Sequence, residues 1–591
     1  MLKFRRAFSL AASLLIALPI VTSGCAKEEQ GSVDRVRLRV FSVKTDSVDQ
    51  DPYQGVGLMR VAVNRASQLI SDEFFTFDKS LGRSLDDIPF GANLQVTIEG
   101  WSAVTDPKSG ALTPSQLLSR GRSARFTMAE GGDAITLQIP MSRLSTFAYT
   151  SQVGTSTGAT ATSLARGRFG HTVTRLYDGR VLITGGLAFK EGHQGDFTNA
   201  NQLSELYRDA ELYDPRSGAF LPTGNLASAR AFHAATYLPP TVTCPNPSGS
   251  PATCMAPQGL VVISGGLSST GGAAQSANSI EVYDPVAGTF QTVASATLGE
   301  GRSGHTSTLL DSNGFVLLAG GFSVKGDGAL AASGTGEVFC LDGLACSASS
   351  TGAGIIFTDN MVQSRAFHTA DRVDLGPRGI AGQELVEAVV LIGGESDDEV
   401  RATTEVFLLK GGFKKVDVAS LPTMGPESAR RPRTRHTATY VDPQKFIHVV
   451  GGFANKAHSK TVQQIDSFDV QTQAFQAGTA FFSVEGRGAH AAVLMDRNAV
   501  LLLGGFAQGA VIDAEAGVYG PGVPLASAEL IFERKDPNDG KTYIDRGSVG
   551  SLLKPRGGAM GLFLENNTAI VIGGVDATSR FQTAGEFFNP L

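Results

Sequence analysis

The chain has 591 residues, of which 42% are hydrophobic and 18% charged, and its formal net charge is −6. This length predicts several domains unless internal repeats account for most of it. Because the net charge is negative, the protein lacks the overall positive charge typical of nucleic-acid-binding proteins. The sequence also has neither zinc-finger spacing nor interleaved aromatic and basic residues. We therefore expect no nucleic-acid partner.

The first 24 residues are typical of an export signal. Three basic residues near the start precede an apolar run at 7–21, and small residues lead into Cys25. The stretch resembles a bacterial lipoprotein signal, which implies that Cys25 carries lipid as the first residue of the mature protein. Ala26, where Asp would favour retention at the inner membrane, implies anchoring at the outer membrane. An ordinary cleaved signal and a twin-arginine export signal stay open as alternatives.

A polar tether at 25–34 leads into residues 35–143, which lack the repeats found further along. Short apolar runs separated by Gly, Asp and Pro predict a small β-sandwich of immunoglobulin-like or transthyretin-like type. The only tryptophan of the chain, Trp101, falls in this domain. We expect it in the core, where large aromatic residues are usually found, and a ligand platform is the less favoured alternative.

From residue 144 onward one motif recurs seven times. Each unit has an arginine, a histidine three residues later, an apolar run, a turn, and a second apolar run that ends in paired glycines. The glycine pairs are Gly185/Gly186, Gly265/Gly266, Gly320/Gly321, Gly393/Gly394, Gly451/Gly452, Gly504/Gly505 and Gly573/Gly574. The arginines are Arg168, Arg230, Arg302, Arg365, Arg433, Arg487 and Arg556. The histidines are His171, His233, His305, His368, His436 and His490, and the seventh unit has Ala559 instead.

Units of this length built from short apolar runs predict a propeller. The repeat resembles the kelch family, although the tryptophan usual in the fourth kelch strand is absent. The resemblance implies an all-β fold in which residues 144–591 form a seven-bladed kelch-type β-propeller, preceded by the small β-sandwich. The paired glycines are expected where the second strand ends beside the next blade, because a side chain there would block close backbone approach.

The seventh unit has no fourth strand after residue 589, so we expect that strand from elsewhere in the chain. Residues 145–150 lie before the first unit and place Phe147 at the recurring aromatic position. Pairing of this segment with the last blade would close the ring and remove an exposed strand edge.

Four further cysteines occur as two close pairs, Cys244 with Cys254 and Cys340 with Cys346. In an exported protein such spacing favours two local disulfides over free thiols. Zinc is disfavoured because no histidine lies near either pair at metal-ligand spacing.

The six repeat histidines come from different units, so we expect them packed around a ring and not gathered on a metal. The copper-radical oxidases similar to galactose oxidase use a Tyr-His pair at this point of the repeat, and the sequence has none. No acid-base set can be aligned with the kelch sialic-acid mutarotases. We expect a non-enzymatic lipoprotein without cofactor that binds a protein or glycan partner at the cell envelope. A secreted enzyme of the copper-radical oxidase or carbohydrate-active type is the alternative.

The seven repeat arginines are the candidate binding face. Each precedes an innermost strand, so a seven-fold arrangement would bring them around one opening, where they could bind an acidic ligand. We favour the alternative, in which each arginine pairs with an acidic residue of a neighbouring blade, such as Glu211, Glu281 or Glu405, because an arginine in all seven units suits a shared packing role.

Overall fold

The fold is all-β, as predicted. In the computed structural model the regular elements are β-strands, joined by 3-10 turns such as Asp496–Asn498. The structure describes residues 13–18, 36–43, 45, 50–77, 91–128, 135–153, 159–189, 203–240, 256–270, 273–310, 314–325, 329–341, 354–374, 387–408, 412–415, 432–442, 445–476, 481–507, 510–513, 518–520, 522–535, 542–576 and 580–590. Within these ranges, no helix has the length and apolar character needed to cross a membrane.

The N-terminal region forms one hydrogen-bonded path of strands. Its members are β1 (Ser13–Leu18), β2 (Val36–Ser42), β3 (Leu58–Arg65), β4 (Gln68–Thr76), β5 (Gly91–Thr105), β6 (Leu112–Arg122), β7 (Phe126–Met128) and β8 (Ile135–Arg143). Their order is β1-β2-β8-β6-β5-β3-β4, with β7 on β5. Apolar residues of β2 and β8, such as Val40 and Ile139, pack against Val61 and Val96 of β3 and β5. The core therefore lies between β2 with β8 on one side and β3 with β5 on the other, and the β6–β8 pairing joins these strands into one path. The immunoglobulin-like or transthyretin-like type of this domain stays a prediction.

In the described residues seven antiparallel sheets follow, each with a path of four strands, and we number them one to seven in chain order. Sheets one to three are β12 (Thr172–Arg175), β13 (Val181–Thr184), β16 (Ala210–Asp214) and β17 (Ala219–Pro222); β18 (Ala234–Leu238), β19 (Leu260–Ser264), β22 (Ser279–Asp284) and β23 (Thr289–Thr297); and β24 (Thr306–Leu309), β25 (Val316–Ala319), β28 (Thr335–Cys340) and β29 (Gly354–Asn360). Sheets four and five are β30 (Thr369–Asp374), β31 (Glu387–Ile392), β32 (Thr404–Leu408) and β33 (Gly412–Lys415); and β34 (Thr437–Val441), β35 (Phe446–Val450), β36 (Gln464–Asp469) and β37 (Ala474–Phe475), with β38 (Phe481–Phe482) also on β36. Sheets six and seven are β39 (Ala491–Leu494), β40 (Val500–Leu503), β43 (Ala528–Lys535) and β44 (Thr542–Ser548); and β45 (Met560–Phe563), β46 (Ala569–Ile572), β47 (Glu586–Asn589) and β9 (Thr146–Tyr149).

Short two-stranded ribbons extend from this framework. Four of them connect the second and third strands of a sheet: β14 (Leu187–Phe189) with β15 (Leu203–Leu206), β20 (Leu267–Thr270) with β21 (Ala273–Ser276), β26 (Phe322–Val324) with β27 (Leu330–Ala332), and β41 (Ala510–Asp513) with β42 (Val518–Gly520). They belong to sheets one, two, three and six. A fifth ribbon pairs β10 (Ser151–Val153) with β11 (Ala159–Ala161).

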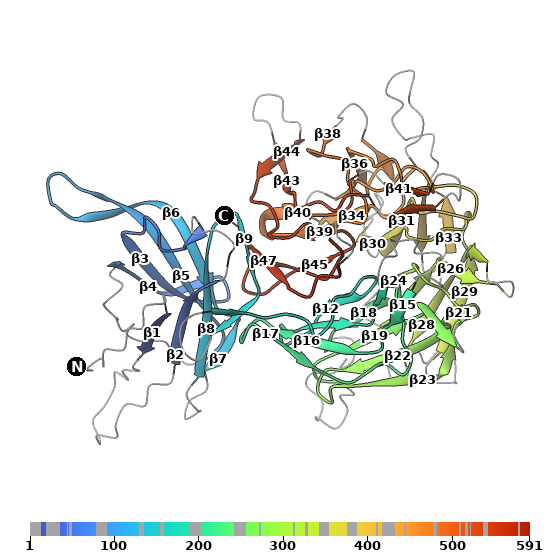
Figure 1. The fold of residues 1–591 in the computed structure, drawn as a ribbon, viewed down its shortest axis with the longest axis horizontal. Helices are drawn as coiled ribbons and strands as arrows, with labels where there is room; N and C mark the ends of the chain where they lie inside the picture. Colours follow the sequence, from blue (N-terminus) through green and yellow to red (C-terminus); the bar gives the residue numbers. More distant parts are fainter. Residues whose placement is uncertain are drawn as a thin grey trace, which may run out of the picture.

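The first strands of the seven sheets lie next to one another in chain order, and β45 of sheet seven lies next to β12 of sheet one. Figure 1 shows the sheets arranged around these inner strands, with the blue N-terminal strands to one side. The described residues of the second strands are almost all buried and mostly apolar, and Val181–Thr184 and Val500–Leu503 are buried throughout. A strand covered on both faces by neighbouring sheets can bury apolar residues in succession, which explains the continuous apolar runs seen in the sequence.

The fourth strand of sheet seven is β9, within the segment 145–150 that the sequence assigned to this place. It pairs antiparallel with β47, Thr146 opposite Asn589 and Tyr149 opposite Glu586. Phe147 is 1% exposed and its ring lies 5.0 Å from that of Phe588. The outermost strand of the last sheet is therefore supplied by a segment more than 400 residues earlier in the chain.

The N-terminal path also contacts sheet seven through side chains. The Asn589 Nδ2 group donates to the carbonyl oxygen of Arg120 at 2.8 Å and to Oγ of Ser142 at 3.0 Å. The Gln95 Nε2 group donates to the carbonyl oxygen of Glu565 at 3.1 Å. These bonds join the two parts of the chain at the sheet where the ring of strands begins and ends.

Candidate functional site

The predicted arginine binding face is not formed, because the seven arginines are buried. Six of them are 0% exposed and Arg433 is 3% exposed. Each donates through Nη1 to the carbonyl oxygen of the first paired glycine, and through Nη2 to an acidic residue of the third strand of its own sheet. The acids are Glu211, Glu281, Glu337, Glu405, Asp466, Glu529 and Glu586. The pairing is within one sheet, so the neighbouring-blade alternative is also corrected.

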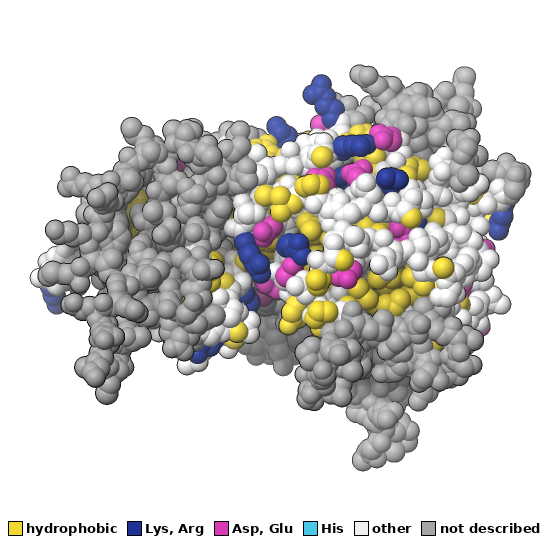
Figure 2. All heavy atoms as spheres, turned by 90° about the horizontal axis from the view of Figure 1, so that it is seen from below, with side chains coloured by type: hydrophobic (Ala, Val, Ile, Leu, Met, Phe, Trp, Pro, Cys, Tyr) yellow, Lys and Arg dark blue, Asp and Glu magenta, His cyan; other side chains and the backbone are white. Residues whose placement is uncertain are grey.

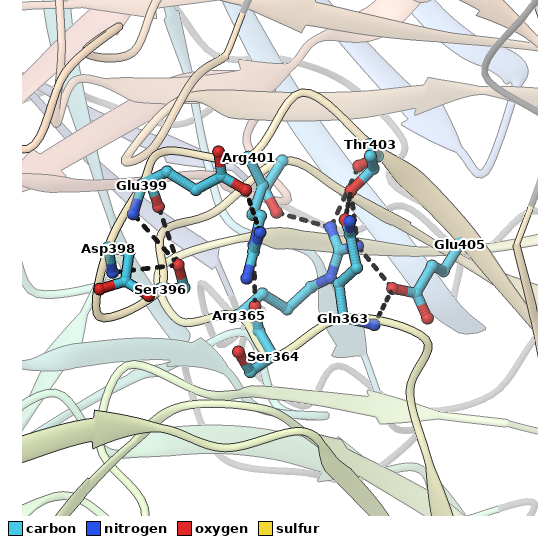
Figure 3. A network of polar contacts seen from close by, with 10 residues as sticks. Gln363, Ser364, Arg365, Ser396, Asp398, Glu399, Arg401, Thr403 and Glu405 are labelled. Atoms are coloured by element: carbon cyan, nitrogen blue, oxygen red, sulfur yellow. Dashed lines mark hydrogen bonds and ion pairs between the residues drawn. The ribbon is translucent and has the colours of Figure 1, made fainter.

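Sheet four shows what each arginine does (Figure 3). Arg365 donates to the carbonyl oxygen of Gly393 at 2.6 Å, to Oγ1 of Thr403 at 3.0 Å and to Oε1 of Glu405 at 2.6 Å. Glu405 also accepts hydrogen bonds from the backbone of the segment that enters the sheet, at Val362 and Gln363. Burial lowers the pKa of Arg365, and the charge of Glu405 opposes that effect. The Arg365–Glu405 ion pair thus joins the segment that enters the sheet, the glycine pair and the third strand. Because both residues are buried, the ion pair is not accessible to a ligand.

The paired glycines join successive sheets, as the sequence predicted. In sheet one, Gly185 has φ +58°, and a Cβ there would lie 2.5 Å from the carbonyl oxygen of Arg230. The next residue, Gly186, donates its N–H to that same carbonyl at 2.9 Å. A side chain at the first glycine would therefore separate the two sheets.

The repeat histidines are packed between sheets, also as predicted. In five of the six, Nε2 lies within hydrogen-bond distance of a hydroxyl on the preceding sheet; for His305 this is Ser264 Oγ at 2.8 Å, and for His490 it is Thr437 Oγ1 at 2.8 Å. Burial, and then the charge of the nearby Arg302, lower the pKa of His305 to about 3. Such histidines are neutral at pH 7. The described residues contain no group of three His, Cys, Asp or Glu side chains placed to hold a metal.

Cys340 is disulfide-bonded. Cys25, Cys244, Cys254 and Cys346 lie outside the described residues. The local pairing of the cysteines and the lipidation of Cys25 therefore stay predictions.

A second set of repeat positions, which the sequence analysis did not single out, forms the centre of the ring. The residue just before each of the six repeat histidines, and before Ala559 in the seventh unit, has a positive φ between +48° and +66°. These ring positions are Gly170, Phe232, Gly304, Phe367, Arg435, Ala489 and Gly558. From Phe232 to Gly558, each donates its N–H to the carbonyl oxygen of the ring position before it, at 2.7–3.1 Å. The backbone thus forms a succession of hydrogen bonds that crosses six of the sheet boundaries.

The residues at the ring positions are half-buried, although the residues on both sides of them are buried. A neighbouring set, which we call the collar positions, follows each glycine pair and forms a β-bridge to the residue before the ring position. The collar positions are Leu187, Leu267, Phe322, Glu395, Phe453, Phe506 and Val575. Members of both sets, with Phe169, Ala231 and Phe581, pack into one apolar cluster.

The repeat pattern is broken by charge at one ring position and one collar position, Arg435 and Glu395. These two residues belong to adjacent sheets and lie together, with 3.8 Å between Arg435 Nη2 and Glu395 Oε1. The Arg435 guanidinium stacks 3.6 Å from the ring centroid of Phe367. His458, in the turn between β35 and β36, approaches the other carboxylate oxygen of Glu395 at 3.1 Å. We call Glu395, Arg435 and His458 the polar cluster.

The electrostatics of the polar cluster follow from its burial. Burial opposes ionisation of Glu395, but the hydrogen bond with His458 and the charge of Arg435 outweigh it, so the pKa of Glu395 lies below its ordinary value. Burial lowers the pKa of Arg435, and Glu395 opposes that change. The Glu395 side chain is 6% exposed and that of His458 is 18% exposed. Three exposed acidic residues, Asp397–Glu399, follow Glu395 in the turn.

Comparisons with known proteins add little to this description. No family model matches the chain, and no curated protein matches it. A solved structure titled "Structure of YjhT" matches 65% of this chain and 99% of that chain, at 12% identity and a TM-score of 0.39. A similarity at this level carries no argument about the fold or the function.

Proposed function

We propose that the seven sheets form a seven-bladed kelch-type β-propeller and that the protein is a non-enzymatic lipoprotein at the outer membrane. The propeller binds a protein or glycan partner at the centre of the ring. Support for the architecture comes from seven four-stranded sheets whose first strands lie side by side in a complete circuit. Support for export comes from the signal sequence and from the disulfide at Cys340, since disulfides persist mainly in oxidising compartments.

The polar cluster is the observation that carries the binding function. A buried ion pair is an expensive replacement for apolar residues, and apolar packing at such positions is often as stable or more stable. The other collar positions are all apolar, so the scaffold does not need charge there. Glu395 and Arg435 both depart from the repeat and lie together, which favours a role for this pair in recognition of a partner.

The connections around the polar cluster are shorter than those of the sheets that carry ribbons. Sheets one, two, three and six carry ribbons between their second and third strands, whereas sheets four and five have short turns there, closed by the bridges Glu395–Val400 and Phe453–Thr461. Figure 2 shows another side of the molecule, the lower side of Figure 1, where the described residues mix acidic, basic and hydrophobic side chains.

The test is to restore the repeat pattern. Glu395→Leu copies Leu187 and Leu267, and Arg435→Ala copies Ala489, so the double variant should fold and melt at the same or a higher temperature. We expect it to lose the partner that the wild-type chain captures in a pull-down from envelope extract or on a glycan array. Arg534→Ala, which removes an arginine from the exposed ion pair with Asp545, is the control for loss of one charge. Retention of the partner by the double variant would contradict this site.

A further inference from the structure

The N-terminal sheet carries a cluster of aromatic and charged side chains that the proposed function does not use. Trp101 was expected in the core, but it is half-buried on the face of the sheet opposite the core residues Val96 and Ile98. Its ring lies 6.3 Å from that of Phe74 on β4, at an angle of 58°. Phe74 is 41% exposed.

Two arginines and two acids fix the polar part of this cluster. Arg60 donates Nε and Nη2 to the two carboxylate oxygens of Asp72, at 2.7 and 2.9 Å, and Nη1 to Glu99 at 3.0 Å. Glu99 accepts two further hydrogen bonds, from Arg120 Nε at 3.0 Å and from Trp101 Nε1 at 3.2 Å. Glu99 thus sets the orientation of both the Arg60 guanidinium and the indole ring.

Arg60 and Asp72 are partly exposed next to Phe74, and Arg60 has N–H groups that can still donate hydrogen bonds. A guanidinium has five N–H donors, and three of those of Arg60 are used by described residues. The Asp72 side chain is 32% exposed and that of Arg60 is 26% exposed. The Arg60 guanidinium carbon lies 5.7 Å from the centroid of the Phe74 ring, so donor, acceptor and ring edge occupy one small surface.

The charge balance selects the class of ligand. Arg60 and Arg120 are matched by Asp72 and Glu99, so the cluster as a whole is neutral. A phosphate, sulfate or acidic sugar would meet no excess positive charge here. A neutral sugar fits, because its C–H face can pack on Phe74 and Trp101 while neighbouring hydroxyl groups accept from Arg60 and donate to Asp72.

We propose that Phe74, Trp101, Arg60 and Asp72 form a binding site for a neutral glycan on the N-terminal sheet, separate from the polar cluster of the ring. The aromatic rings provide the packing surface, and Glu99 with Arg120 is the support that holds Arg60 and Trp101 in place. Preorganisation of this kind lowers the ordering cost of binding.

The single tryptophan makes the site directly observable. Because Trp101 is the only tryptophan in the chain, a change in tryptophan emission reports on this cluster alone. The experiment titrates the purified full-length chain with neutral cello-, xylo-, malto- and manno-oligosaccharides, and with oligogalacturonate as the acidic counterpart. We expect a saturable emission change with at least one neutral oligosaccharide and none with oligogalacturonate.

Variants separate this site from a general effect on folding. Phe74→Ala and Asp72→Asn should each weaken the neutral oligosaccharide by roughly tenfold, with the melting temperature nearly unchanged because both residues are exposed. Leu69→Ala, on the same strand and 48% exposed, is the matched control and should bind as the wild type does. The Glu395→Leu/Arg435→Ala variant should also keep the signal, so failure at the ring and failure here are distinguishable. No emission change with any neutral oligosaccharide, a response to oligogalacturonate only, or equal binding by Phe74→Ala would each overturn the proposal.

Discussion

The buried histidines link the stability of the ring to pH. Burial, and then the charge of a nearby arginine, lower the pKa of His171, His305 and His436 to about 3, and the same causes hold the other three repeat histidines well below 6.5. In the unfolded chain these groups take up protons near pH 6.5. Below that pH the unfolded state binds more protons than the folded state, so the fold loses stability as the pH falls from about 6.5 towards 3.

We predict that the free energy of unfolding in urea falls between pH 7 and pH 5, by roughly 2 kcal/mol for each such histidine. Asp371 and Glu211 act in the opposite direction, because burial raises the pKa of both carboxyl groups, that of Asp371 to about 6, but they are two groups against six histidines. His305→Gln keeps a polar partner for Ser264 and removes one titrating group. Its loss of stability between the two pH values should therefore be smaller than that of the wild type, and an equal loss would show that the histidines do not cause the effect.

The repeat arginines give a second prediction at this scale. Arg365→Met leaves the carboxylate of Glu405 buried without its charged partner and should cost about 3–5 kcal/mol of unfolding free energy. Adding Glu405→Gln removes that charge and still offers an oxygen to the backbone of Val362 and Gln363, so the double variant should recover part of the loss. Urea titration of the two variants checks this order, and greater stability of the single variant would contradict it.

Residues of the candidate site differ in how far the sequence could predict them. Glu395 and Arg435 stand out once the residues that follow the glycine pairs and precede the histidines are compared across units. His458 lies in a turn without a counterpart in the other units, so no repeat comparison points to it. Pairing of the arginines with third-strand acids was the favoured expectation, but the repeat does not tell whether the acid belongs to the same sheet or to a neighbouring one. Only the structure shows that each acid belongs to the same sheet.

At the scale of the elements, the contact between sheets depends on the first glycine of each pair. Gly185→Ala places a methyl group against the carbonyl oxygen of Arg230 at a backbone angle that disfavours alanine. We predict a loss of more than about 1 kcal/mol of unfolding free energy, measured by urea or thermal unfolding. Gly354→Ala is the matched control, since its Cβ would meet only the carbonyl oxygen of Ser295, at 3.8 Å. A similar loss in both variants would mean that steric contact between sheets is not the cause.

Strands of the repeat units were predictable, and most connections between them were not. A run of four or five mostly apolar residues between turn residues predicts a buried strand, as in Leu260–Ser264 before Gly265 and Gly266. The connection between β13 and β16 of sheet one contains the paired strands β14 and β15, which the repeat pattern does not indicate. The two strands of such a ribbon pair with each other and not with the sheet. Their sequence therefore has only a weak alternation of apolar and polar residues.

At the scale of the whole molecule, the lipid anchor is the prediction with the largest consequence. Cys25→Ser removes the attachment site, and each buried lipid methylene contributes roughly 0.8 kcal/mol to membrane binding. The variant should therefore move from the membrane fraction to the soluble fraction of the exporting cell, as followed by immunoblotting. A wild-type chain that is already soluble after export would contradict the lipoprotein assignment.

The pairing of β9 with β47 also determines how the molecule would respond to tension. Thr146 lies opposite Asn589, so the chain enters β9 and leaves β47 at the same end of the pair. A force applied between residues 145 and 590 would part the strands from that end and break their hydrogen bonds one after another, not all together. The Asn589 side chain ties this same end to Arg120 and Ser142 of the N-terminal sheet. These hydrogen bonds of Asn589 therefore bear load together with the first bonds of the β9–β47 pair, and sheet seven would lose its outermost strand only after both have broken.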